Sequence, residues 1–167
     1  AAECIPIYNA LDTNLYFAVP PERRFEADLA LLNDHTPERE ARVKEFFFKP
    51  AAALPEQKFL LGGSGWTGES LPANVSSAGE IPIDDQNAFN CTLRAILAIN
   101  CGFASRYGFS PPSRVFEAAG AGACLITDKW EGIEFFLEPE REVLVAANGD
   151  EVAEQLRQLT PERARQI

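Results

Sequence analysis

The sequence predicts a Rossmann-like α/β domain, in which a mostly parallel six-stranded sheet forms the middle of three layers. Short apolar runs alternate with longer segments of helical character, and this alternation is typical of a parallel sheet with crossover helices. A polar residue, Asp128, directly follows the short apolar run at residues 123–127, where an open α/β sheet places its ligands. The chain has 167 residues, so it is long enough to bury one sizeable core.

The overall charge narrows the possible partners. The formal net charge is −10 and the pI is about 4.6. A polyanion would be repelled over most of such a surface, so we expect no general nucleic-acid or anionic-membrane binding. No apolar run approaches the roughly 20 residues that cross a bilayer, so no membrane span is expected. The sequence lacks methionine, and we therefore expect it to be a piece of a longer protein.

The cysteines and the single histidine do not form a metal-binding pattern. Cys4, Cys91, Cys101 and Cys124 contain no CxxC spacing, and His35 lies in a loop-like context. This spacing fits no familiar zinc signature, so no metal site is expected. The cysteines are most simply free thiols of a reducing compartment, which predicts a cytoplasmic location.

The elements follow in order along the chain. Residues 1–24 are rich in proline and lack periodicity, so they are predicted to be an interdomain linker or N-terminal extension, and residues 25–167 to be the domain. The predicted strands are 28–32, 59–61, 73–81, 94–100, 123–127 and 142–146. The predicted helices begin after Thr36, after Asp84 or Asp85, after Ser110, within 130–137, at Gly149 and after Thr160.

The helix after Ser110 carries polar residues that need an explanation. Arg114 lies in its first turn, where a cation is disfavoured by up to ~1 kcal/mol, and a bound anion would reverse this sign. Glu117, one turn later, could accept hydrogen bonds from vicinal hydroxyls such as those of a ribose. The alternative is an Arg114–Glu117 ion pair on a solvated face, worth ~0.2 to 0.5 kcal/mol. The residues alone leave both interpretations open.

A glycine-rich turn, GGSGW, follows the second predicted strand at residues 62–66. Such a turn can bring backbone amides close to a phosphate, which makes Gly63 and Ser64 candidate binding residues. A plain tight turn is the alternative, because GxGxxG is absent. Trp66 could stack on a base or cover the sheet edge.

The segment SPPSRVFEAAGAGACLITDKWEGIEFFLEPEREVLVA resembles the donor-binding half of bacterial glycosyltransferases of GT-B architecture, in particular the CgeB-type family and more broadly the group 1-like enzymes. Fainter similarity extends through FLLGGSGW to YNALDTNLY. The resemblance implies that this chain is the C-terminal half, which holds a nucleoside diphosphate sugar. A missing N-terminal domain would bind the acceptor.

The resemblance also assigns residues by position. It implies that Glu117 binds the ribose, that Ser113 and Arg114 approach the diphosphate, and that residues 128–134, including Asp128 and Trp130, line the sugar pocket. Arg106 would substitute for a basic residue that the family often carries where this chain has Cys101. Phe109 stands where related enzymes often carry a second acid, which is a departure from the family pattern.

The implied activity is metal-independent sugar transfer to an acceptor hydroxyl, without a cofactor. The helix N-terminus and an arginine would stabilise the leaving diphosphate, and the missing half would supply the general base. The alternative is a non-catalytic nucleotide-binding or scaffold module on the same fold, which the phenylalanine at position 109 favours. A flavodoxin-like or response-regulator-like domain is a weaker alternative, because the first strand lacks the necessary acidic cluster.

Overall fold

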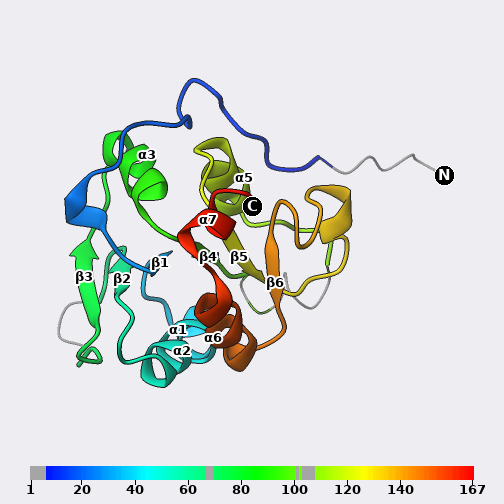
Figure 1. Ribbon diagram of the computed structural model, residues 1–167. Coiled ribbons are helices and arrows are strands. Elements are labelled where there is room, and N and C mark those ends of the chain that lie inside the picture. Colours follow the sequence, from blue (N-terminus) through cyan, green and yellow to red (C-terminus); the bar gives the residue numbers. More distant parts are fainter. Residues whose placement is uncertain (1–6, 67–69, 101, 103–107) are drawn as a thin grey trace.

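The computed structural model describes residues 7–66, 70–100, 102 and 108–167. Within these residues the strands form a six-stranded sheet in the order β3-β2-β1-β4-β5-β6, and each neighbouring pair is parallel (Figure 1). The predicted Rossmann-like fold is confirmed. The strands are β1 Leu29–Leu32, β2 Phe59–Gly62, β3 Val75–Gly79, β4 Ile96–Ala98, β5 Leu125–Asp128 and β6 Leu144–Ala146.

Helices cover both faces of the sheet. In Figure 1, α1, α2 and α6 lie on one side, and α3 and α5 on the other. The helical elements are η1 Arg23–Phe25, α1 Pro37–Val43, η2 Lys44–Phe48, α2 Lys49–Ala53, α3 Ile83–Thr92, α5 Ser113–Gly120, η3 Ile133–Phe135, α6 Gly149–Gln158 and α7 Pro161–Ala164. Each described helix is too short or too polar to cross a membrane.

Successive side chains of the central strand β1 point to opposite faces of the sheet, so the hydrophobic core forms two clusters, one on each face. Leu29 and Leu31 of β1 pack in the cluster that contains Phe47 and Leu156, from the helices of one layer. Ala30 of β1 points the other way, into the cluster of α3 and α5. Because both faces are covered, the central strands β1, β2 and β4 consist of apolar residues and glycine, and all four residues of β2 are buried.

The starts of three predicted helices need correction. Ser110 does not cap α5, which begins at Ser113 with Pro112 in the N-cap position. The reason is that a residue before proline avoids the α region, and two successive prolines keep the chain extended. Pro82, and not Asp84 or Asp85, holds the N-cap position of α3. The helix predicted within 130–137 is only the 3₁₀ turn η3, entered through Gly132 at φ 91°.

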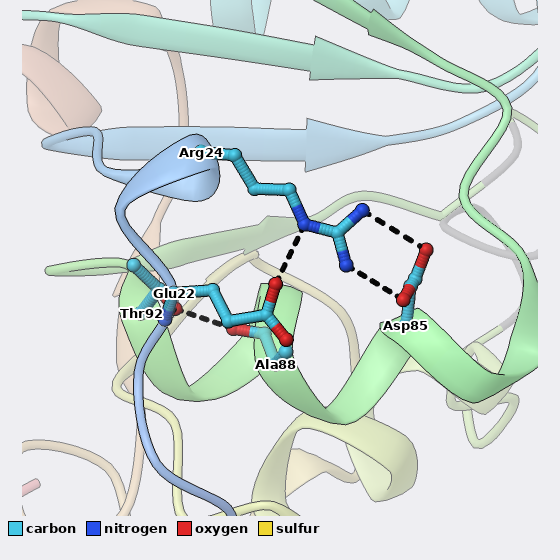
Figure 2. A network of polar contacts seen from close by, with 5 residues as sticks. All are labelled: Glu22, Arg24, Asp85, Ala88 and Thr92. Atoms are coloured by element: carbon cyan, nitrogen blue, oxygen red, sulfur yellow. Dashed lines mark hydrogen bonds and ion pairs between the residues drawn. The ribbon is translucent and has the colours of Figure 1, made fainter.

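The N-terminal strap, defined as residues 7–22, runs across α3 and α5 (Figure 1). Its end is fixed by a network of polar contacts (Figure 2). The Arg24 guanidinium pairs with Glu22 at 2.6 Å and with Asp85 of α3 at 2.7 Å. The Glu22 amide donates to Thr92 Oγ1, and the Thr92 hydroxyl donates to the Ala88 carbonyl. The part of the predicted linker that the structure describes therefore packs on the domain.

Gly149, the first residue of α6, allows this helix to approach α2 and η2. A Cβ at this position would overlap the Glu45 carbonyl oxygen, which is backbone and cannot rotate away. We expect Gly149→Ala to lower the free energy of unfolding by about 2 kcal/mol, which a thermal melt would show as a shift of roughly 4–8 °C. Gly102→Ala is the control, because no described atom lies within 4 Å of its Cβ position. Equal melting temperatures for the two variants would contradict this packing.

Candidate functional site

A cavity of about 440 Å³ opens at the carboxyl ends of β1, β2 and β4. This is the point where the chain order of the strands reverses: β2 and β3 lie on one side of β1, whereas β4, β5 and β6 lie on the other. Open α/β sheets bind ligands at such a point. The described lining residues are Leu31, Leu32, Asn33, Asp34, Arg39, Gly63, Ser64, Glu80, Ile81, Gln86, Leu97, Ala98, Ile99, Pro112, Ser113 and Arg114.

The N-terminus of α5 forms one wall of this cavity. Ser113 and Arg114 are its first two helical residues, and both line the cavity. The first amides of a helix have no intrahelical partner, and the helix dipole adds partial positive charge there. This wall therefore has the electrostatics of an anion site.

Arg114 is held in this wall by two neighbours. Its Nη1 lies 3.0 Å from Glu117 Oε2 and donates to Gln86 Oε1 at 3.3 Å. The side chains of Arg114 and Glu117 are only 18% and 17% exposed. The two residues therefore form an ion pair, but this pair does not lie on a solvated face of the helix. Burial lowers the pKa of Arg114, and the charge of Glu117 partly opposes this shift. Glu117 is not among the described lining residues of the cavity.

The glycine-rich turn contributes the opposite wall through Gly63 and Ser64. The Gly63 amide donates to the Gly79 carbonyl at 2.8 Å, and both the amide and the hydroxyl of Ser64 donate to Asp34 Oδ1 at 2.8 Å. These hydrogen bonds, led by the one from the Ser64 amide, lower the pKa of Asp34. Gly63 has a φ of 116°, and a Cβ there would overlap the Asn33 backbone. The two amides thus have protein partners, and the turn shapes the wall.

Trp66 at the end of this turn is a buried residue of the sheet edge. It is 6% exposed, donates from Nε1 to the Asn33 carbonyl at 2.7 Å, and stacks on His35 with ring centroids 4.5 Å apart. Of the two interpretations of Trp66, base stacking and covering of the sheet edge, this arrangement fits the second.

Arg39 is a cavity residue that the sequence reasoning missed. It lies in α1, lines the cavity, and hydrogen-bonds Asn33 Oδ1. Arg39 and Arg114 place guanidinium groups from two different helices on the same cavity, whereas Asp34 and Glu80 add carboxylates. The signal was available, because a helix that follows the first strand of a parallel sheet begins at the carboxyl edge.

Asp128 and Trp130 are not among the described lining residues of the cavity. Asp128 is 1% exposed, accepts the Asn100 amide at 2.8 Å through Oδ1, and pairs through Oδ2 with Arg42 of α1. Trp130 is 3% exposed and donates to Thr127 Oγ1 at 3.4 Å. The structure therefore brings together Ser113, Arg114, Gly63 and Ser64, but not Asp128 and Trp130. Arg106 lies outside the described residues.

The strand order and the cavity at its reversal define a Rossmann-like α/β protein with a candidate ligand site at the carboxyl edge of the sheet. A family model described as glycosyl transferase-like matches residues 23–167. The chain belongs to this family. A search of curated proteins finds no match.

Solved glycosyltransferase structures share this fold. HepE of Anabaena, in complex with UDP-glucose, superposes with a TM-score of 0.69 at 16% identity, over 96% of this chain and 50% of HepE. Sucrose-phosphate synthase of Thermosynechococcus elongatus gives 0.69 at 16% identity, over 94% and 44%. The β-glucosyltransferase of phage T4, in complex with its UDP-glucose substrate, gives 0.62 at 16% identity, over 87% and 41%. This chain spans half or less of each of these proteins.

Asp128 joins the end of β5 to α1, and its removal tests that role. Loss of the Asp128 charge would leave the Arg42 guanidinium without its carboxylate, at a place where Arg42 is 22% exposed. We expect Asp128→Asn to lower the free energy of unfolding by about 2 kcal/mol, less than for a fully buried pair because Arg42 can reach water. Glu138→Gln, which breaks the exposed pair with Arg141, should cost below about 0.5 kcal/mol. Chemical denaturation that gives equal losses would show that Asp128 has no structural role.

Proposed function

We propose that this chain is the donor-binding domain of a GT-B glycosyltransferase of the CgeB type, which transfers a sugar from a nucleoside diphosphate sugar to an acceptor hydroxyl. The observation that carries the proposal is the cavity at the strand-order reversal, with the α5 N-terminus and a partly buried arginine, paired with Glu117, in its wall. Family membership supports the reaction class. The HepE and phage T4 structures, which contain UDP-glucose, favour a uridine nucleotide as the first donor to test.

The cavity wall offers two kinds of positive charge to a diphosphate. The α5 amides supply partial charges at fixed positions, and the guanidinium groups of Arg114 and Arg39 supply full charges from two helices. Arg114 is already desolvated, so an anion beside it regains interaction energy that burial has removed. Asp34 opposes this attraction from the other wall, where the amide and hydroxyl of Ser64 hold its carboxylate.

Glu117 would hold the sugar of the nucleoside one helical turn from the diphosphate. A carboxylate can accept two hydrogen bonds from the vicinal hydroxyls of a ribose. The ion pair with Arg114 holds this carboxylate next to a residue of the cavity wall. The two side chains then contact neighbouring parts of one ligand, which accounts for a buried Arg114–Glu117 pair at this position.

In the transfer step, these groups act on the leaving nucleoside diphosphate. Negative charge grows on the diphosphate as the bond to the sugar breaks, and positive groups fixed in a low-dielectric wall stabilise that charge without reorganisation. The acceptor and the general base would come from the N-terminal domain that GT-B enzymes place opposite this one. The coverage of half or less of the solved enzymes is consistent with that arrangement.

Phe109 supports the alternative of a nucleotide-binding scaffold without turnover. Phe109 stands where related enzymes often carry an acid, and here it is 41% exposed with its ring 5.8 Å from that of Phe135. Donor hydrolysis and transfer by the longer protein separate the two functions, because a scaffold would show neither. The free thiols of Cys91 and Cys124 support a reducing compartment such as the cytoplasm for either function.

Arg114→Ala tests the diphosphate contact. Because a hydrogen bond to a charged group is worth about 1.5–3 kcal/mol, we expect roughly 10- to 100-fold weaker binding of UDP, with little change for uridine. Titration calorimetry of both ligands measures this difference. Arg141→Ala removes an exposed arginine outside the described lining residues and should bind UDP like the parent chain. Equal losses for UDP and uridine would show that Arg114 does not contact phosphate.

Glu117→Gln tests the ribose contact while preserving the shape of the side chain. We expect the affinities for UDP and uridine to fall together, by roughly tenfold, because both ligands carry the ribose hydroxyls. Glu154→Gln, at an exposed pair on α6, is the matched control. Unchanged affinity combined with an earlier melt would make Glu117 a structural residue only.

A further inference from the structure

The N-terminal strap is joined to α3 by side chains of that helix. The Asn87 amide group bridges the strap: its Oδ1 accepts the Phe17 amide at 3.3 Å, and its Nδ2 donates to the Leu15 carbonyl at 2.8 Å. Further along, Cys91 Sγ accepts the Val19 amide at 3.4 Å. These bonds hold both sides of the intervening residue, Tyr16. The strap precedes the region that the family model matches, which starts at residue 23.

Tyr16 is connected to the cavity wall through one shared acceptor. Its hydroxyl donates to Gln86 Oε1 at 3.3 Å, and the same oxygen accepts from Arg114 Nη1 at 3.3 Å. Gln86 and Arg114 both line the cavity. Burial, and then the charge of Glu117, raise the pKa of Tyr16, so its hydroxyl keeps its proton and acts as a donor at neutral pH.

The chemistry of the Gln86 amide explains why this connection matters. A glutamine side chain can turn its oxygen or its NH₂ group toward a neighbour. If the NH₂ group faced Arg114, two donors would meet and the guanidinium would lose a partner. A donor from Tyr16 favours the orientation in which the oxygen faces both groups. Arg114 then remains shared between Gln86 and Glu117.

We propose that Tyr16 is a positioning residue of the donor site, which holds the Arg114 guanidinium in the cavity wall by fixing the orientation of Gln86. The strap is therefore a functional part of the donor domain. The effect of Tyr16 on donor binding rests on the proposed function. The positioning of Arg114 itself is a property of the ligand-free chain.

The full chain carrying Tyr16→Phe tests this role, since the substitution removes one hydroxyl and keeps the ring. Titration calorimetry should show UDP binding weakened about fivefold, as for the loss of one hydrogen bond, with uridine affinity unchanged. In the ligand-free chain, NMR of ¹⁵N-arginine side chains should show faster rotation of the Arg114 guanidinium, by roughly twofold or more. Gln86→Leu should give the same changes, and the double variant should add nothing to either.

Tyr8→Phe is the matched control from the same strap. The Tyr8 ring packs against Phe136 with centroids 4.9 Å apart, and its hydroxyl has no hydrogen-bond partner among the described residues. It should leave UDP affinity and Arg114 rotation unchanged.

The outcomes separate this inference from the proposed function. If the parent chain binds UDP and Tyr16→Phe behaves like Tyr8→Phe in both measurements, the positioning role is overturned. It is also overturned if Tyr16→Phe weakens UDP and uridine equally together with an earlier melt, because that result describes a structural residue. If the parent chain binds no UDP, the proposed function fails, whereas the rotation of Arg114 still decides whether Tyr16 positions it.

Discussion

The reversal of strand order between β1 and β4 is the constraint on which the site depends. From β1 the chain moves outward through β2 to β3, and it then returns to begin β4 on the other side of β1. The segments that leave β1 and β4 therefore diverge to opposite faces of the sheet, α1 to one and α5 to the other (Figure 1). The space between them at the carboxyl edge cannot be filled by either helix, and the cavity occupies it.

Polar contacts with neighbouring elements hold the helices that carry Arg39 and Arg114 in place. Arg42 of α1 pairs with Asp128 at the end of β5, and Asp128 also accepts the amide of Asn100 after β4. These contacts tie α1, which carries Arg39, to strands on the far side of the reversal. On the other face, α3 and the strap hold Arg114 through Gln86. Neighbouring polar side chains thus hold the positive groups of the cavity in place, as a preorganised anion site requires.

The strands could be predicted because a strand that is buried on both faces is a short apolar run in the sequence. β2 and β5 are continuous apolar runs, and both lie within one residue or two of the predicted ranges. The start of α5 was placed too early because a serine before two prolines looks like a cap, whereas the backbone restriction of those prolines delays the helix to Ser113. Arg114 is predicted as a binding residue from its place in the first turn and Ser113 from the family resemblance, and both line the cavity.

Other parts of the site depend on tertiary contacts that no local pattern contains. The amides of Gly63 and Ser64 were expected to face a ligand, but Gly79 and Asp34, which are distant in sequence, accept them. The strap lacks periodicity because its order comes from side chains of α3 about 70 residues away, as the Asn87 contacts show. Arg39 is different, because a helix that follows the first strand could have been placed at the carboxyl edge from the sequence; the structure adds which of its side chains lines the cavity.

The central claim is that the α5 N-terminus and Arg114 bind the diphosphate of a nucleotide in this cavity. A crystal structure of the chain soaked with UDP tests it most directly. The account predicts phosphate oxygens about 3 Å from the Ser113 or Arg114 amide and from the Arg114 guanidinium. A UDP molecule bound elsewhere on the chain, or an α5 terminus that contacts only protein at saturating UDP, would contradict it.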